Sequence, residues 1–433
     1  MKLEHLTLTN FRGFASLEIS FDPAFTVLLG GNMAGKSAVL DATAVAVGGL
    51  FDLGGYFGWW LGAKAAPSRN IDDDEVRVVV VDVAGVPDLQ QQSPVEVSAR
   101  AKVKDPLGQQ REVSWTRTRD AVTTTLRELD HAQQATLVQL RDDLPVVAQY
   151  GTRRAWRHSG QAEPLRGVGS RYDGYAGCFD ITSTHKLLAS WMHKQTLVQL
   201  QRGGGYVQPQ LKAVEAAVRS CVDGVTRFWY DVQYDELRLE LVGGNLQSFA
   251  MLSEGVRNTL AMVADIAWRC AVLNPQHGAD AHLRTEGVVL IDELDLHLHP
   301  KWQRRVVSDL RRTFPNIQFI VTTHSPQIVA SVSRSQVRIL DNNQLIGEQP
   351  HVEGRDANEI LEDVFGVPPR PDDVRAEIDA IDQLIEAEKF ADARRRLAEL
   401  QQRLGPDDTA VVRARWLLDT EDPQPVDRAA TPP

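Results

Sequence analysis

The segment Gly30–Ser37 constrains the fold of this chain more than any other stretch. It reads Gly-Gly-Asn-Met-Ala-Gly-Lys-Ser, so a glycine and four residues precede Gly-Lys-Ser. An apolar run, residues 25–29, comes before it, and an Ala-rich apolar segment, residues 38–47, comes after it. The pattern predicts a buried strand, a glycine turn and a helix that begins at Lys36. This spacing between a strand and a helix is typical of a phosphate-binding P-loop.

The residue types of this loop suit an anion. Gly30 and Gly35 let the backbone approach a phosphate that a Cβ atom would obstruct. Backbone N–H groups, including that of Asn32, and the start of the helix would point at the phosphates. Lys36 is expected to reach the β- and γ-phosphates, and the hydroxyl of Ser37 is expected to bind Mg²⁺. We therefore predict ATP and Mg²⁺ as cofactors, against the alternative of an ordinary glycine turn.

Composition narrows the class of protein. The chain has 433 residues, enough for two or three domains, and its 43% hydrophobic and 24% charged residues are ordinary for a globular protein. A net charge of −11 argues against a uniformly basic nucleic-acid surface. Three widely spaced cysteines fit a reducing cytoplasm. Neither a signal peptide nor an apolar run of membrane-spanning length stands out, so no membrane association is expected.

Alternating residues predict strands around the loop. Residues 2–9 and 17–21 form an expected hairpin, with Phe11 and Phe14 in the core and Arg12 as a candidate nucleotide contact. Further strands are predicted at 76–81, 95–103 and 111–117, as an antiparallel sheet at the edge of this lobe. The Gly- and aromatic-rich stretch 51–67 fits an exposed flap or a buried irregular segment equally well.

The middle of the chain alternates helices and strands. Helices are predicted at 134–143, 184–201 and 208–222, and strands at 144–152, 226–232 and 237–242. A basic loop is either a solvated loop or a phosphate- or DNA-binding segment, and its arginines are Arg153, Arg154, Arg157, Arg166 and Arg171. No sustained heptad repeat is present, which excludes a long coiled-coil arm.

Two further stretches complete a candidate site. Leu252–Asn258 places a Ser-x-Gly turn at the start of a helix over 259–273, which is an anion-binding arrangement. Residues 287–291 predict a buried parallel strand whose carboxyl end carries Asp292 and Glu293. We expect Asp292 to hold Mg²⁺ and Glu293 to orient or deprotonate the attacking water.

A last buried strand, residues 319–322, is followed by His324. This places His324 at the same sheet edge as Asp292, where it is able to donate to the γ-phosphate. His297 and His299, in the stretch before a helix predicted to run through Arg312, have no third ligand at a recognisable spacing. They are read as structural residues rather than a metal site.

Taken in order, these elements resemble the ABC-type ATPases of the RecF/SMC branch. Asn10–Phe14 looks like the opening motif of that branch, and Gly30–Ser37 looks like its Walker A. The remaining correspondences are Ser253, Glu254 and Gly255 with the ABC signature, Asp292 and Glu293 with Walker B, Asp295 with the D-loop, and His324 with the switch histidine. The resemblance implies catalytic roles for Glu293 and His324 and a cofactor contact at Asp295. It covers residues 1–420.

Closer likeness is carried by Tyr150-Gly151-Thr152, by Leu296–Pro300 and by Gly354–Leu361. These look like a bacterial group of small ABC ATPases that includes the ATPase partners of nucleases in anti-phage systems such as Septu and some retrons. The chain departs from the branch at Met33, where a glycine is usual. A positive φ there costs about 1–3 kcal/mol for a bulky residue. Gln149, at a strand end, is the candidate Q-loop residue and metal contact.

The resemblance implies an α/β fold: an ABC-type P-loop ATPase head with a mixed central sheet, an antiparallel β lobe and a helical lobe, plus a small helical C-terminal segment. It also implies a homodimer or higher oligomer in which the signature of one copy covers the ATP of the other. The predicted function is a regulatory ATPase that controls a partner nuclease in anti-phage defence, since no nuclease constellation is visible in the chain. The alternatives are a RecF-like DNA-repair ATPase that binds DNA ends or gaps, and a nucleotide-binding scaffold without turnover.

The C-terminal part changes in composition after Leu340. We assign residues 1–350 to the ATPase head, with lobe insertions over 71–245, and residues 351–420 to a helical segment. Helices are expected at 374–386, 391–404 and 409–418. Residues 421–433, acidic and Pro-rich, are expected to be disordered. The helices serve either to dock a partner or to pack on the core, and the sequence does not separate these alternatives.

Overall fold

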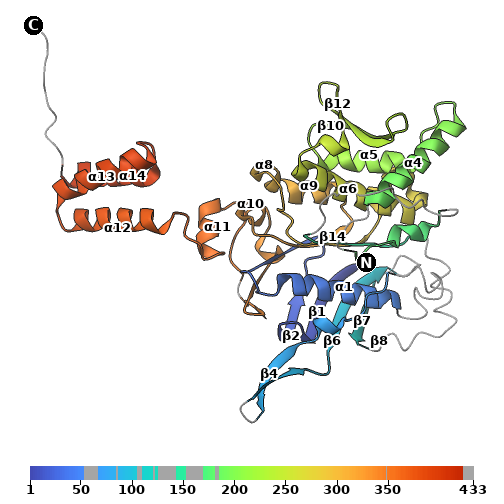
Figure 1. Cartoon of the computed structure of the whole chain (residues 1–433), viewed down its shortest axis with the longest axis horizontal. Helices are drawn as coiled ribbons and strands as arrows, with labels where there is room; N and C mark the ends of the chain where they lie inside the picture. The colour runs from blue at the N-terminus through green and yellow to red at the C-terminus, as the bar shows by residue number, and fades with distance from the viewer. Residues whose placement is uncertain are drawn as a thin grey trace, which may run out of the picture. The chain divides into compact units, whose positions relative to one another are not determined.

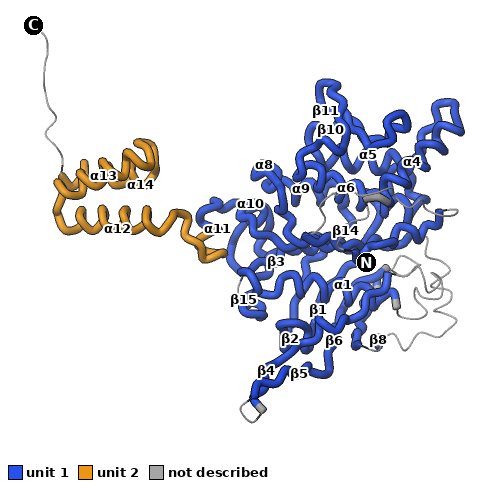
Figure 2. The backbone as a smooth tube through the Cα atoms, viewed as in Figure 1, with its two compact units in different colours: residues 1–360 blue, residues 361–433 orange. Residues whose placement is uncertain are grey.

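The structure is a computed structural model that describes residues 1–52, 67–83, 86–104, 110–119, 122–124, 143–152, 169–180, 185–347 and 349–422. Some predictions therefore lie outside the described residues. These are the aromatic-rich stretch from 53 to 66, the helix over 134–142, four arginines of the basic loop (153, 154, 157 and 166) and the tail from 423. The chain forms two compact units, Met1–Ile360 and Leu361–Pro433 (Figure 2).

A six-stranded sheet forms the centre of the first unit. Its strand order is β16 (Gln344–Leu345), β15 (Val337–Asp341), β3 (Phe25–Leu29), β14 (Ile317–Thr322), β13 (Gly287–Ile291) and β9 (Val146–Tyr150). All neighbours pair in parallel except β15 and β16. The strands β3, β9, β13 and β14 are buried along their whole length. These continuous apolar runs are typical of strands covered on both faces.

An antiparallel five-stranded sheet lies on one side of the central sheet. Its order is β2 (Phe14–Ser20), β1 (Lys2–Phe11), β6 (Glu96–Lys104), β7 (Gln110–Thr118) and β8 (Val122–Thr124). Helix α1 (Lys36–Asp52) contacts strands of both sheets, so it is sandwiched between them (Figure 1). Phe11 and Phe14 are fully buried, which confirms their assignment to the core.

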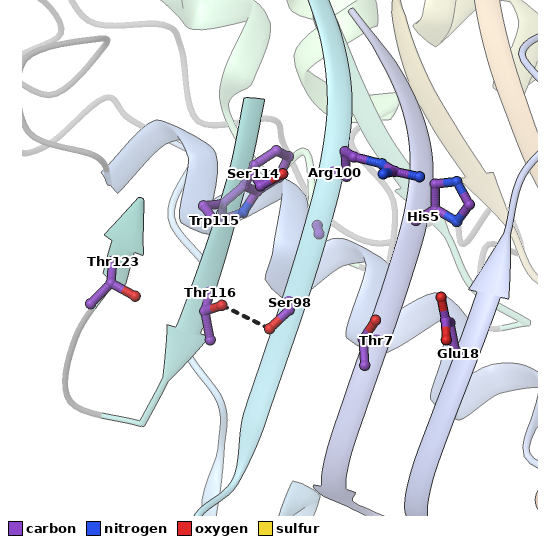
Figure 3. A pocket seen from close by; sticks show the side chains of 10 residues that line it. His5, Thr7, Glu18, Ser98, Arg100, Ser114, Trp115, Thr116 and Thr123 are labelled. Carbon is purple, nitrogen blue, oxygen red and sulfur yellow. Dashed lines mark hydrogen bonds between the residues drawn. The ribbon is translucent and has the colours of Figure 1, made fainter. Parts of the chain in front are cut away.

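The outer face of this five-stranded sheet is polar and concave. Side chains from neighbouring strands line the concavity, among them Thr7, Arg100 and Thr123 (Figure 3). The hydroxyls of Ser98 and Thr116 lie 2.7 Å apart across β6 and β7. Alternation along each strand explains this face, because every second residue points away from α1.

The predicted strand over 76–81 contacts this sheet only at its start, where Val76 forms an isolated antiparallel bridge with Phe11 of β1. It forms β4 (Val78–Val83), which pairs only with β5 (Val86–Gln91) among the described strands, in a two-stranded ribbon (Figure 1). Period-2 alternation predicts a strand but does not select its neighbour, and strands close in sequence pair readily as a hairpin. The prediction that this strand belongs to the antiparallel sheet was therefore wrong for its part within β4.

Helices cover the other side of the central sheet. They include α4 (His185–Arg202), α5 (Pro209–Cys221), α6 (Glu254–Leu273), α7 (Ala281–Arg284) and α10 (Pro326–Val329), and α6 contacts β9. A three-stranded sheet of β10 (Val225–Asp231), β11 (Glu236–Leu241) and β12 (Asn245–Ser248) packs on α5 through β10. Figure 1 shows α6 and α1 on opposite sides of the central sheet.

The single helix predicted to run through Arg312 is broken. It is α8 (Pro300–Gln303) followed by α9 (Val306–Thr313), and Arg305 between them has a φ of −117°. Arg305 forms ion pairs with Asp223 and with Asp309, the latter at 2.7 Å. The pair with Asp309 is local, but the pair with Asp223 joins residues far apart in the sequence, so helical periodicity did not predict the break.

The second unit consists of antiparallel helices that follow α11 (Ala357–Asp363). They are α12 (Asp372–Glu386), α13 (Phe390–Leu404) and α14 (Thr409–Glu421). Their apolar faces form one core, made of Ile381, Ala393, Leu397, Leu400, Val411, Ala414 and Leu418. These helices thus bury their apolar side chains against one another.

The predicted fold class is confirmed: the described residues form a mixed α/β fold with a largely parallel central sheet, an antiparallel β lobe and helices. Among the same residues, no helix combines the length and the apolar character that crossing a membrane requires.

Candidate nucleotide-binding site

The phosphate loop has a conformation that its outer glycines make attainable. Gly30 and Gly35 have φ angles of 147° and 95°. A Cβ atom on Gly30 would lie 2.2 Å from the carbonyl oxygen of Leu340, and one on Gly35 would lie 2.4 Å from the ring of Phe14. Both positions therefore exclude a side chain, and the ring of Phe14 packs against the loop at Gly35.

Met33 has a left-handed backbone, although it stands where the RecF/SMC branch usually has a glycine. Its φ is 67°, and its side chain is 94% exposed. The loop therefore keeps the turn that a glycine would make at this position, at the cost of a strained bulky residue. The neighbouring Ala34 is buried, so the loop presents Met33 and hides Ala34.

Lys36 is folded back onto the loop. Its ammonium donates to the carbonyl oxygens of Gly30 at 2.8 Å and Gly31 at 2.9 Å. Burial lowers the pKa of Lys36 below its usual value, although Asp292 and Glu293 act in the opposite direction. A phosphate bound in this loop would place a negative charge beside the buried ammonium and would stabilise its charged form.

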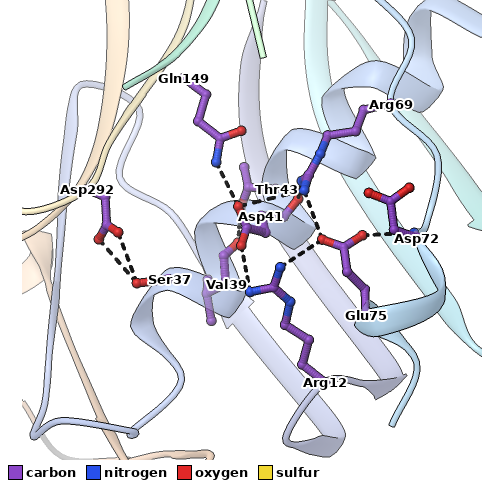
Figure 4. A network of polar contacts seen from close by, with 10 residues as sticks. All are labelled: Arg12, Ser37, Val39, Asp41, Thr43, Arg69, Asp72, Glu75, Gln149 and Asp292. Atoms are coloured by element: carbon purple, nitrogen blue, oxygen red, sulfur yellow. Dashed lines mark hydrogen bonds and ion pairs between the residues drawn. The ribbon is translucent and has the colours of Figure 1, made fainter. Parts of the chain in front are cut away.

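Ser37 and Asp292 meet at the carboxyl edge of the central sheet (Figure 4). The hydroxyl of Ser37 lies 3.1 and 3.3 Å from the two carboxylate oxygens of Asp292. Both groups offer the hard oxygen ligands that Mg²⁺ prefers, and Mg²⁺ usually takes only one or two protein ligands beside phosphate and water. Among the described residues, no group of three or more His, Cys, Asp or Glu side chains is placed to hold a metal ion. The pair fits Mg²⁺.

Thr322, which the sequence analysis did not single out, orders the acidic pair. Its hydroxyl donates to Asp292 at 2.6 Å and accepts from the backbone N–H of Glu293 at 2.7 Å. Glu293 has a φ of 49°, a strained value for a residue of this size. The signal was present in the sequence, since Thr322 ends the strand next to the one that carries Asp292.

Asp295 joins the two loops that leave β13 and β14. Its carboxylate accepts from the hydroxyl of Thr323 at 2.5 Å and from the backbone N–H of His324 at 3.2 Å. These hydrogen bonds connect the loop after β14, which contains His324, to the loop that follows Glu293. The parallel pairing of β13 and β14 brings Asp292, Glu293, Asp295 and His324 to one edge.

The signature turn begins helix α6. Ser253 is its N-cap residue, with no capping hydrogen bond from its side chain. A Cβ atom on Gly255 would lie 2.0 Å from the carbonyl oxygen of His297, so this glycine allows close packing on the loop after Glu293. The Nε2 atom of His297 lies 3.8 Å from the carboxylate of Glu254, and His299 caps α8 by accepting from the N–H of Lys301. Both histidines thus have structural contacts.

Arg12 and Gln149 both contact Asp41, which lies on α1 one helical turn after Ser37 (Figure 4). Arg12 pairs with Asp41 at 2.7 Å and with Glu75 at 3.1 Å. The amide of Gln149 donates to Asp41 at 2.8 Å. The structure therefore brings these two candidates to each other through Asp41 and not to the pair of Ser37 and Asp292.

A second arginine completes this cluster. Arg69 pairs with Glu75 at 2.9 Å and donates to the backbone oxygen of Asp41 at 2.7 Å. Asp41 lies on α1, whereas Arg69 and Glu75 follow in a later stretch of the chain, so no local pattern in the sequence marked the cluster. Buried Gln149 leaves its Oε1 atom without a hydrogen-bond partner in the structure.

Comparison with known proteins places this geometry in context. Two family profiles match: "AAA ATPase domain" over residues 1–45, and "AAA domain, putative AbiEii toxin, Type IV TA system" over residues 224–330. A "Retron Ec83 probable ATPase" from Escherichia coli is 39% identical over 207 residues, 47% of this chain and 38% of that protein. A "Retron Vc95 probable ATPase" from Vibrio cholerae serotype O1 biovar El Tor is 48% identical over 98 residues, 23% of this chain and 19% of that protein.

The "Septu protein PtuA" of Bacillus thuringiensis is 32% identical over 152 residues, 33% of this chain and 37% of that protein. Over these segments the chain is similar to ATPases named for retron and Septu systems, which supports an ABC-type ATPase of this kind. It spans well under half the length of these curated relatives.

Among solved structures, an SMC head bound to the C-terminal winged-helix domain of ScpA is similar to this chain. The TM-score is 0.46 and the identity 16%, over 80% of this chain and 98% of the other.

Proposed function

We propose that this chain binds ATP with Mg²⁺ and hydrolyses it in a composite site between two copies. The observation that carries the proposal is the convergence of Lys36, Ser37, Asp292 and Glu293 at the carboxyl edge of a parallel sheet, ordered by Thr322. Ligands of such sheets bind at this edge.

The residues have separate tasks in this proposal. Backbone N–H groups of Gly30–Ser37 and the ammonium of Lys36 hold the phosphates, while Ser37 and Asp292 hold Mg²⁺, whose charge would screen the phosphate oxygens. The carboxylate of Glu293 accepts a proton from the attacking water. His324 donates toward the γ-phosphate.

The second copy supplies Ser253, Glu254 and Gly255. The start of α6 provides free backbone N–H groups for a phosphate. Within one chain, α1 and α6 lie on opposite sides of the central sheet (Figure 1). A second copy related by a two-fold rotation would place the start of its α6 opposite the start of α1 in the first copy.

Phosphate release and size-exclusion chromatography test this proposal together. Glu293→Gln should lower turnover by about 10²–10⁴-fold, because the general base is lost. The same variant should elute as a dimer with ATP and Mg²⁺. Glu362→Gln, on the exposed face of α11, is the matched control and should behave as wild type. A monomeric Glu293→Gln variant in saturating ATP would contradict the composite site.

We further propose that ATP turnover controls a partner nuclease in anti-phage defence. The support is the similarity to proteins named for retron and Septu systems. A nuclease or reverse-transcriptase gene next to this one would agree with the proposal. When the chain is co-expressed with that nuclease, phage plaque counts should fall, and Lys36→Met should restore them. Protection that persists with Lys36→Met would separate defence from nucleotide binding.

A DNA-repair ATPase is the second candidate. The specific support is a RecF protein from Lacticaseibacillus casei, 42% identical over 45 residues, 10% of this chain. This function requires DNA binding that weakens steeply with salt. A titration of labelled gapped duplex at 50 and 200 mM salt distinguishes the two candidates, because the nuclease-control proposal requires no such binding. Phosphate release near zero with intact ATP binding would instead indicate a scaffold.

A further inference from the structure

Two methionines stand out on the surface of the first unit. Among the large apolar side chains of the described residues, Met33 is 94% exposed and Met251 is 84% exposed, and these are the two highest values. Single exposed apolar residues are common and need no explanation. These two, however, belong to the two halves of the proposed composite site: Met33 is in the phosphate loop, and Met251 is two residues before Ser253.

The backbone holds both side chains outward. Met33 has a φ of 67° and lies between Asn32 and buried Ala34. Met251 ends a short 3-10 helix, Phe249–Met251, whose first residue is buried. The guanidinium of Arg257 donates to the carbonyl oxygen of Ala250 at 3.2 Å, which ties this short helix to α6.

We propose that, in the ATP-bound dimer, Met33 of one copy packs against Met251 of the second copy. The inference rests on the proposed composite site and names an apolar contact within it. The phosphate loop begins α1 and the signature turn begins α6, and these helices lie on opposite sides of the central sheet (Figure 1). The methionine contact is therefore proposed between two copies and not within one. A two-fold dimer forms this contact twice.

The chemistry of methionine suits this contact. Its unbranched thioether adapts to irregular surfaces, and burial removes apolar area from water only when the dimer closes. Met33 thereby offsets the backbone strain of a bulky residue in the loop. A glycine at this position would relieve the strain and would lose the contact.

Cysteine cross-linking is a clean test because the natural cysteines are inert. Cys178, Cys221 and Cys270 are all buried, and burial raises the pKa of each thiol to about 12. Thiols with so high a pKa are poor nucleophiles at neutral pH. Introduced surface cysteines will therefore react selectively.

The experiment joins Met33→Cys and Met251→Cys in the full-length Glu293→Gln chain and adds a short bismaleimide. We expect a covalent dimer only when both cysteines, ATP and Mg²⁺ are present. Neither single variant should give a covalent dimer. The control pair Met33→Cys with Leu200→Cys should give none either, because Leu200 is 61% exposed but lies on α4, away from the signature turn in sequence. Sedimentation velocity on the same samples records whether a dimer has formed. A dimer without cross-linking overturns the methionine contact and leaves the composite site standing, whereas absence of a dimer overturns both.

A double-mutant cycle gives a second readout. Met33→Asn and Met251→Asn should each weaken ATP-dependent dimerisation by about tenfold or more, as loss of a buried methionine contact predicts. Asn is chosen because it tolerates a left-handed backbone. The double variant should lose little more than either single one, since each removes the same contact. Additive losses would overturn the proposal.

Discussion

Lys36 shows how one residue combines a binding role with a cost to the fold. Its ammonium is buried, contacts two loop carbonyls, and has a lowered pKa because burial disfavours its charge. The folded-state pKa lies below the unfolded one, so at neutral pH the charged form opposes folding. This penalty is lost as pH rises from the lowered folded-state pKa to the unfolded-state pKa. Lys36 is thus expected to serve phosphate binding while it lowers the free energy of unfolding.

Lys36→Met should therefore separate binding from folding. ATP affinity should fall by about 10²-fold or more, because a charge-assisted phosphate contact is lost. The free energy of unfolding should not fall, since a buried charge is removed. Calorimetric ATP titration and urea unfolding at pH 7 measure the two effects. A variant that binds ATP normally, or one that is clearly less stable, would contradict this account.

Thr322 is a positioning residue that acts through its neighbours. Its hydroxyl links Asp292 to the backbone of Glu293, so its loss should misplace the general base without removing it. We expect Thr322→Val to lower kcat by about tenfold or more, with a smaller change in KM. Thr322→Ser keeps the hydroxyl and should restore kcat. If both variants have the same kcat, the hydroxyl has no such role.

At the scale of elements, a buried polar network ties the signature helix to the central sheet. Tyr150, at the end of β9, donates to Asp265 of α6 at 2.7 Å, and Arg269 pairs with Asp265 at 2.9 Å. Arg269 also donates to the carbonyl oxygen of Gly174 at 2.8 Å. Burial raises the pKa of Tyr150, so its hydroxyl stays protonated and remains a donor.

The network predicts unequal costs for its members. Asp265→Asn leaves the Arg269 charge buried without its counter-ion and should cost about 3–5 kcal/mol of unfolding free energy. Tyr150→Phe removes one hydrogen bond to a charged group and should cost about 1.5–3 kcal/mol. The double variant Asp265→Leu with Arg269→Leu should lose less than Asp265→Asn. Chemical denaturation measures all three, and equal losses for both single variants would argue against a buried ion pair.

At the scale of the whole molecule, the chain consists of two units with separate cores. The core of the second unit includes Leu418, which is fully buried, whereas Trp416 on the same helix is 65% exposed. A unit with a core of its own is expected to unfold on its own.

Leu418→Ala should destabilise the second unit alone. The cavity should cost about 2–5 kcal/mol, seen as an earlier transition in calorimetry, while the ATPase rate and the main transition stay unchanged. Trp416→Ala is the exposed control and should shift neither transition by much. A single transition that shifts as a whole would indicate one cooperative unit instead.

The order of motifs, the α/β class and the strand and helix positions near the phosphate loop were predictable from sequence alone. Local spacing is enough for these, because a buried strand, a glycine turn and a helix start are each specified by residues adjacent in the chain. Three helices of the second unit were predicted for the same reason, from the 3.6-residue period of their apolar faces.

Tertiary structure decided which side chains meet. Strand order and register bring Thr322 to Asp292, place Asp41 between Arg12 and Gln149, and set β4 and β5 apart from the five-stranded sheet. Alternation specifies the face of a strand but not its neighbour, so such contacts are not encoded in any local window. The glycines of Gly30–Ser37 were readable in advance, but only the folded loop shows Met33 held outward in a strained conformation by its neighbours.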